Sequence, residues 1–158
     1  MKRWQGWLLV ILLVIPLWLA VSPSSPAMIR TIEEAPNQVV VQSRHQLRDN
    51  RGFTWQVILF SRRDQLQLRL VGFPEQYHFR HPDPLLLITA KGQTLTAVDD
   101  FPKADSVANV GQFDLLPLVP RLPQSEPLVL RPPLEEQGIE IAVPAAVVIE
   151  WHALMEGV

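Results

Sequence analysis

Hydrophobic and polar residues alternate along the middle of the chain in short runs. Residues 66–70, "LQLRL", place three leucines on one face and polar side chains on the other, which is typical of a half-buried antiparallel strand. Residues 53–62, "FTWQVILFSR", begin with the same alternation, but Ile58 and Phe60 make the second face apolar as well. We therefore expect this strand to be covered on both sides at its far end.

Turn residues separate these runs and join them into hairpins. The turn "DNRG" at residues 49–52 lies between two runs, and Lys91-Gly92 lies between another two. The pattern predicts about seven strands, at residues 39–47, 53–62, 66–70, 85–90, 94–100, 127–133 and 139–144. Strands at this spacing favour a mainly β fold, a single antiparallel β-sandwich or barrel.

The end of the chain has a different period. Prolines are spread through the preceding residues and exclude long helices there, but Pro144 suits the first position of a helix. Apolar residues then recur at helical spacing, at Val147 or Val148, Trp151, Leu154 and Met155. We expect one C-terminal amphipathic helix that closes an open end or edge of the sheet; docking on a membrane or a partner is the alternative.

Residues 101–126 show no sustained period and carry four prolines near their ends. Connections longer than about 15 residues are uncommon in compact domains. We expect this segment to wrap the sheet, with four apolar side chains buried: Val110, Phe113, Leu115 and Leu116.

The N-terminus has the order of a secretory leader: a basic start, an apolar run over residues 7–21, and a stretch of small residues. The run is shorter than the roughly 20 residues of a spanning helix. Small residues at Ser25 and Ala27 favour cleavage after Ala27, which makes residues 1–27 a signal peptide. The alternative is an uncleaved anchor helix that contacts the membrane through residues 4–21, because tryptophans flank the run.

Length and composition limit what residues 28–158 can be. Removing 27 of the 158 residues leaves residues 28–158, the size of one exported domain, with 12 Lys and Arg against 16 Asp and Glu. This acidic balance disfavours a nucleic-acid partner. The absence of cysteine excludes a disulfide and a lipoprotein anchor.

Residues 78–83, "HFRHPD", are the one cluster with atoms suited to a metal: His78, His81 and Asp83. Pro82 and Pro84 push their neighbours toward extended backbone, and a spacing of three residues in a strand sends the two histidines to opposite faces. We therefore predict a bend in which His81 caps a turn and His78 is an ordinary strand residue, and no metal or cofactor.

Other catalytic patterns are missing. No serine of the exported part lies in a G-x-S-x-G context, and no glycine-rich loop could cradle a phosphate. Paired carboxylates occur at Glu33-Glu34, Asp99-Asp100 and Glu135-Glu136, but neighbours in sequence do not establish a cleft with two carboxylates, so we expect them to be solvated. We predict no catalytic residue.

Positive charge concentrates between residues 44 and 80. If two hairpin turns lie at the same end of the sheet, they form a basic rim suited to an acidic protein surface or to lipid headgroups, at Arg48, Arg51, Arg62 and Arg63. The alternative is an ordinary set of solvated arginines.

Several segments in this order resemble a family of small exported proteins of unknown function, found mainly in cyanobacteria: "RTIEEAPNQVVVQSRHQLRDNRGFTWQVILFSR", "LRLVGFP", "HPDPL", "VGQFDLLPLVPRLP" and "VPAAVVIEW". The likeness covers most of residues 30–152. It implies the thylakoid lumen or periplasm of a photosynthetic bacterium, and no known reaction or binding residue. The positions matching the family's pattern are mostly turn formers and large apolar anchors: Trp55, Gly72, Pro74, His81, Pro82, Asn109, Gly111, Asp114 and Trp151.

The leading functional hypothesis is a non-catalytic exported β-domain that binds a protein partner, as an accessory or assembly factor at a photosynthetic or envelope membrane. A second hypothesis is a β-barrel that binds a lipid or another small hydrophobic ligand. A third is a metal-dependent hydrolase that uses His78, His81 and Asp83.

Overall fold

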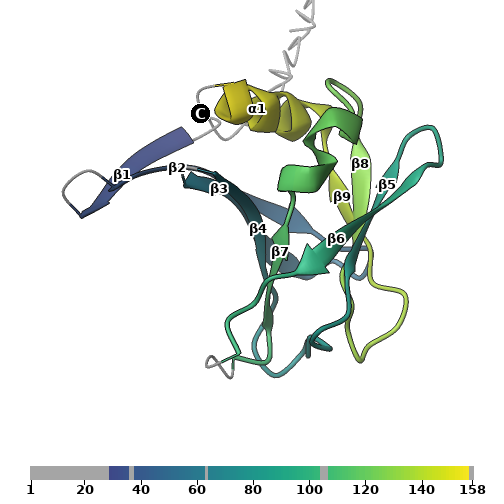
Figure 1. The fold of residues 1–158 in the computed structure, drawn as a ribbon. Helices are drawn as coiled ribbons and strands as arrows, with labels where there is room; N and C mark the ends of the chain where they lie inside the picture. The colour runs from purple at the N-terminus through teal and green to yellow at the C-terminus, as the bar shows by residue number, and fades with distance from the viewer. Residues whose placement is uncertain (1–28, 36–37, 63, 104–106, 157–158) are drawn as a thin grey trace, which may run out of the picture.

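The computed structural model describes residues 29–35, 38–62, 64–103 and 107–156. Within these ranges the chain forms nine strands, one six-residue 3-10 helix and one α-helix (Figure 1). In chain order they are β1 (Ile29–Ala35), β2 (Gln38–Arg48), β3 (Thr54–Arg62), β4 (Gln65–Val71), β5 (Leu85–Thr89), β6 (Thr94–Asp99), β7 (Val110–Asp114), η1 (Leu116–Arg121), β8 (Leu128–Arg131), β9 (Ile141–Val143) and α1 (Ala145–Glu156).

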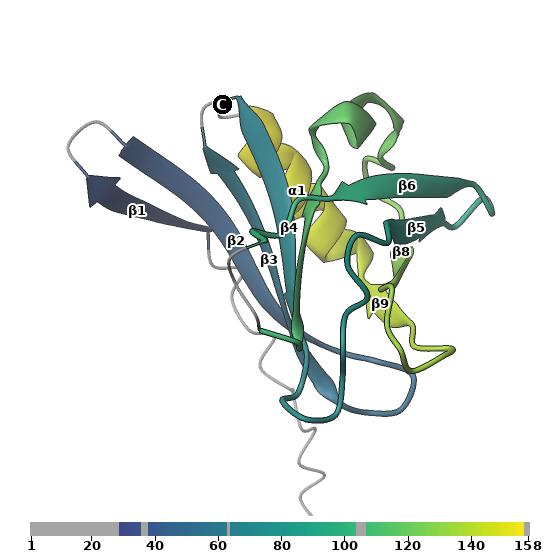
Figure 2. The same ribbon diagram turned by 60° about the horizontal axis from the view of Figure 1, so that its bottom comes forward.

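The strands form one antiparallel sheet in the order β1-β2-β3-β4-β7-β6-β5-β8-β9. Strand β6 joins its two halves, because Leu95 pairs with Leu87 of β5 whereas Asp99 pairs with Phe113 of β7. The sheet therefore bends sharply at β6, and Figure 2 shows the two halves running in different directions.

The curled sheet nearly meets itself, but it does not close. A single bridge joins Asp49, after β2, to Ile141 of β9. Helix α1 packs on β2 and β3 and lies across one end of the curve (Figure 1). The fold is therefore mainly β, as predicted, but it is neither a two-sheet sandwich nor a closed barrel: β6 makes the halves continuous, and the seam beside β9 carries one bridge.

The sheet has nine strands where the sequence predicts seven. The additional strands are β1, which pairs with β2, and β7, which lies between β4 and β6. Strand β7 falls inside the segment predicted to be irregular. Phe113 and Leu115 are buried there as predicted, Val110 is half-buried, and Leu116 is exposed, contrary to the prediction.

The inner side of the sheet is filled by one cluster of buried apolar side chains. The alternating leucines of β4 point into it, as predicted. Helix α1 begins directly after Pro144, whose carbonyl accepts hydrogen bonds from the Val147 and Val148 amides, and its apolar stripe completes the cluster. The predicted C-terminal helix is thus confirmed, and it packs on β2 and β3.

A buried carboxylate organises the turn between β2 and β3. Asp49 accepts hydrogen bonds from the backbone amides of Arg51 at 2.9 Å and Phe53 at 3.0 Å, from the indole of Trp55 at 2.9 Å and from the hydroxyl of Tyr77 at 2.5 Å. Burial alone would raise the pKa of Asp49, but these hydrogen bonds outweigh it and hold that pKa below its usual value. Burial and the bond to Asp49 raise the pKa of Tyr77.

The predicted leader, residues 1–27, lies outside the described residues. Among the helices that the structure describes, none has the length and apolar character needed to cross a membrane.

Candidate functional site: an arginine groove on the outer face

The outer face of the sheet, opposite the core, carries a row of four side chains across four strands, of which three are polar and one is apolar. Arg44 of β2 pairs with Ile58 of β3, Ile58 pairs with Arg69 of β4, and Arg69 pairs with Gln112 of β7. Directly cross-strand residues have side chains on the same face. The register therefore sets Arg44 and Arg69 on either side of Ile58.

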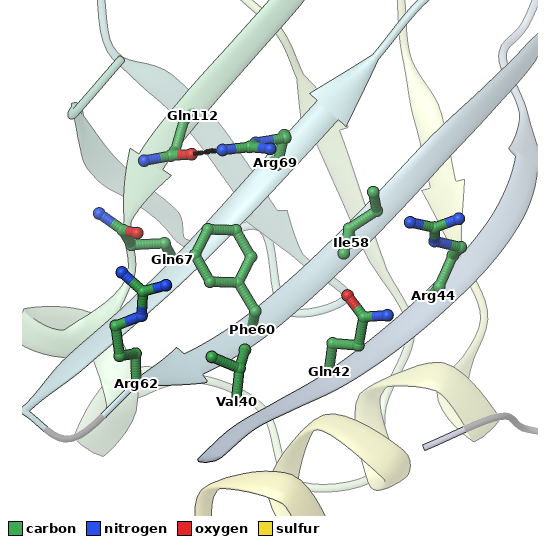
Figure 3. Close-up of a pocket in the computed structure, with 9 residues that line it drawn as sticks. All are labelled: Val40, Gln42, Arg44, Ile58, Phe60, Arg62, Gln67, Arg69 and Gln112. Carbon is green, nitrogen blue, oxygen red and sulfur yellow. Dashed lines mark hydrogen bonds between the residues drawn. The ribbon is translucent and has the colours of Figure 1, made fainter. Parts of the chain in front are cut away.

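This row and its neighbours line a hollow of about 250 Å³, which we call the arginine groove. Its nine lining residues are Val40, Gln42, Arg44, Ile58, Phe60, Arg62, Gln67, Arg69 and Gln112 (Figure 3). Val40 and Ile58 are buried at its floor, and Phe60 is half-buried. The second apolar face predicted for β3 is thus this floor, covered by long polar side chains.

Arg69 is held in place before any ligand arrives. Its Nε and Nη2 donate to Gln112 Oε1 at 3.0 and 2.6 Å, and its guanidinium carbon lies 5.4 Å from the centre of the Phe60 ring. Gln112 is itself buried and donates to the carbonyl of Asp100 at 3.3 Å. Fixing a guanidinium in advance lowers the entropy lost on binding.

Arg44 differs from Arg69 in being exposed, and its side chain makes no hydrogen bond or ion pair within the described part of the chain. Arg62 also lines the groove, near its Val40 end (Figure 3). None of the nine lining residues is acidic. Gln67 donates a hydrogen bond to the carboxylate of Asp100, which lies outside the lining.

The groove has the chemistry of a binding surface. Guanidinium groups recognise carboxylates and phosphates through paired hydrogen bonds, and carboxamides can both donate to and accept from peptide groups. The lining contains no serine, histidine or carboxylate that could serve as a nucleophile or general base. The arrangement suits contact with an anionic, partly apolar ligand.

The basic rim predicted from sequence does not form as one surface. Arg48 and Arg51 lie at the turn between β2 and β3, whereas Arg62 ends β3 at its other end. Consecutive hairpin turns of an antiparallel sheet lie at opposite ends of their shared strand, so these residues cannot share a rim. Arg63 lies outside the described residues.

Sequence reasoning missed Arg44 and Arg69 as partners of Arg62. The signal was present in the alternation, because Arg69 lies opposite the leucines of its strand and Arg44 lies two positions after Gln42 on one face of β2. Only the pairing register of β2, β3 and β4 shows that these faces adjoin.

The histidine cluster is also separated by the fold. His81 Nδ1 lies 2.7 Å from Asp99 Oδ2, and its ring stacks on Phe101 with centroids 4.7 Å apart. Asp83 pairs instead with Arg80, at 3.4 Å. His81 sits in a turn, where the Asp83 amide donates to the Arg80 carbonyl at 3.0 Å, in agreement with the predicted bend.

His78 lies between β4 and β5 and not in a strand, contrary to the prediction, and it has a different partner. Its Nδ1 lies 2.9 Å from Glu136 Oε1, and this hydrogen bond raises the pKa of His78. Burial raises the pKa of Glu136, but the hydrogen bonds from the ring and backbone of His78 outweigh it and lower that pKa overall. The weak candidate trio of His78, His81 and Asp83 is therefore separated in the fold, because each side chain has a different partner.

Comparison with known protein families identifies a family. A protein-family model described as a protein of unknown function, DUF3122, matches residues 27–154. No curated protein and no solved structure matches the chain.

Proposed function

The chain belongs to the DUF3122 family, and we propose that it is a non-catalytic binding domain whose arginine groove holds an acidic segment of a partner protein. The observation that carries this proposal is the composition of the groove: three arginines and three glutamines around an apolar floor, with no acidic residue among the nine that line it. Oppositely charged surfaces attract and orient partners in this way.

A protein segment fits the groove better than a bare anion. The floor of Val40, Ile58 and Phe60 offers apolar contact to a side chain, and the glutamines offer hydrogen bonds to peptide groups. The chain as a whole has a formal net charge of −2, so the attraction is local to this face.

We further propose that the partner belongs to a photosynthetic or envelope membrane, and that the domain acts there as an accessory or assembly factor in the thylakoid lumen or periplasm. The support is the leader-like order of residues 1–27 together with the resemblance to exported cyanobacterial proteins.

The other two hypotheses gain no support from the described residues. A lipid-binding barrel requires an apolar interior space, whereas the inner side of this sheet holds one packed cluster of side chains. A hydrolase built on His78, His81 and Asp83 requires these side chains to converge, but each is paired with a different residue.

Site-specific photo-crosslinking in the producing cells tests the proposal. A photoreactive residue replaces Gln42, which lines the groove, and in a matched variant replaces Thr96, which is exposed on β6. We expect a discrete adduct from position 42 only, with the crosslinked partner peptide rich in aspartate and glutamate. Equal adducts from both positions, or a crosslinked peptide without excess acidic residues, would contradict the proposal.

A further inference from the structure

Three side chains with metal-ligating atoms converge away from the groove, where the segment after β4 meets the loop between β8 and β9. One ligand atom each from His78, Glu135 and Glu136 lies within 4.8 Å of the other two. The Glu136 carboxylate accepts a hydrogen bond from the His78 backbone amide at 3.1 Å while its other oxygen faces the ring nitrogen. The imidazole and this carboxylate are therefore already oriented toward each other.

The backbone holds the two segments in register. The Glu135 amide donates to the His78 carbonyl at 2.9 Å, the Arg80 amide donates to the Pro133 carbonyl at 2.8 Å, and Phe79 forms a bridge with Leu134. Ligands fixed on a paired backbone lose little freedom when they close on an ion.

In the described part of the chain, no lysine or arginine forms an ion pair with Glu135 or Glu136. Glu126 and Glu140 pair with Lys91 and Arg131, whereas Glu135 makes no side-chain hydrogen bond or ion pair within the described part of the chain. The guanidinium of Arg51 does not pair with either glutamate; it donates to the Gln137 carbonyl at 2.9 Å. Two carboxylates thus face one imidazole, an arrangement that favours an added positive charge.

We propose that His78, Glu135 and Glu136 form a site for a divalent transition-metal ion such as Zn²⁺. One imidazole nitrogen and two carboxylate oxygens match the mixed ligands that such ions take, whereas Ca²⁺ and Mg²⁺ prefer oxygen alone. Zinc bonds to these atoms at roughly 2.0–2.2 Å, so a common ion requires only a small movement of the exposed Glu135 side chain. Water would complete the coordination.

Calorimetric titration of the full-length, untagged protein with Zn²⁺ in mild detergent tests this site. We expect one equivalent to bind, and His78→Ala and Glu135→Gln each to weaken binding by about tenfold or more. Glu135→Gln should fold normally, because the exposed side chain makes no hydrogen bond or ion pair in the described part of the chain. A loss of Zn²⁺ binding in this variant therefore reports on the site. The matched controls are His81→Ala and Glu156→Gln, which remove a histidine and a glutamate outside the cluster and should leave the affinity unchanged.

A spectroscopic measurement identifies the ligand. With Cu²⁺ as the probe, electron paramagnetic resonance should show nitrogen coupling in the native protein and in His81→Ala, and lose it in His78→Ala. Absence of stoichiometric Zn²⁺ binding, or nitrogen coupling that persists in His78→Ala and disappears in His81→Ala, would overturn the proposal. Because the arginine groove contains none of these residues, its proposed role is tested separately.

Discussion

The hydroxyl of Tyr77 donates a 2.5 Å hydrogen bond to the carboxylate of Asp49, and both residues are buried. The bond links the turn after β2 to the segment after β4. The same turn is tied to the loop before β9, since the Asn50 amide donates to the Glu140 carbonyl at 2.9 Å. Asp49 and Asn50 together therefore join three segments at the seam where the sheet approaches itself.

Asp49→Asn should destabilise the protein by about 2–4 kcal/mol. The aspartate carboxylate accepts hydrogen bonds from four donors. In asparagine an NH₂ group replaces one carboxylate oxygen, so it would face hydrogen-bond donors and could not accept from them. Urea denaturation measures the loss. Asp83→Asn, which removes an exposed pair with Arg80, is the matched control and should cost less than about 0.5 kcal/mol. Equal effects of the two substitutions would refute the organising role of Asp49.

The same pair predicts how stability depends on pH. The pKa of Asp49 is lower in the folded protein than its usual 3.8, so its contribution is present above pH 3.8 and is lost as the pH falls through the folded value. The pKa of Tyr77 is raised above its usual 10.0, so its contribution is present below pH 10.0 and is lost as the pH rises through the folded value.

The alkaline limb can be observed directly, because Tyr77 is the single tyrosine of the chain. Ultraviolet titration should show tyrosinate forming near pH 10.0 in urea and at a higher pH in the folded protein. The native protein should have a larger free energy of unfolding than Tyr77→Phe, and this difference should shrink above pH 10.0. Identical titration curves in the folded and unfolded states would contradict the described hydrogen bond.

His45 of β2 and Glu150 of α1 form a pair that we expect can be replaced by two apolar residues without loss of stability. His45 Nε2 lies 3.2 Å from Glu150 Oε2, yet neither atom has a hydrogen-bond partner and the other Glu150 oxygen is also unpaired. Removing His45 alone leaves the buried Glu150 carboxyl group without its neighbour and should cost about 3–5 kcal/mol. His45→Val with Glu150→Leu should restore or exceed native stability, because apolar packing often replaces buried ion pairs without loss. A double variant clearly less stable than the native protein in thermal denaturation would contradict this expectation and show that the pair stabilises the fold.

Gly111 of β7 lies under the ring of Phe79. A Cβ at this position would come within 2.5 Å of the Phe79 ring carbon Cε1. Gly111→Ala should therefore destabilise the protein by about 1–3 kcal/mol. Combined with Phe79→Leu, the substitution should cost less than the sum of the two single changes, as a double-mutant cycle in urea would show. Strict additivity would indicate that the ring does not limit this site.

Most strands could be predicted from the alternation of polar and apolar residues. Strand β4 and helix α1 follow their periods closely, because each buries one regular face. Strand β7 was not predicted, since it is only five residues long, includes Gly111 and lies in a proline-flanked segment. Its partner β4 is far away in sequence, and such long-range pairing leaves little local signal.

The candidate site was less predictable than the fold. The sequence predicts that Phe60 belongs to a strand covered on both faces. In the structure, Phe60 forms part of the floor of the arginine groove. The sequence indicates that Arg44 and Arg69 are polar positions of strands, but not that Ile58 separates them. Register depends on which strands pair, so the groove required the structure.

The affinity of the groove for the partner captured from position 42 tests the central claim most directly. Arg44→Glu with Arg69→Glu reverses two groove charges, and Lys103→Glu with Arg121→Glu makes the same change in net charge at exposed positions outside the groove. The groove variant should bind the partner roughly a hundredfold more weakly, and the native affinity should fall as salt rises, while the control variant keeps native affinity. Native affinity in the groove variant, or an equal loss in both variants, would contradict the proposed function.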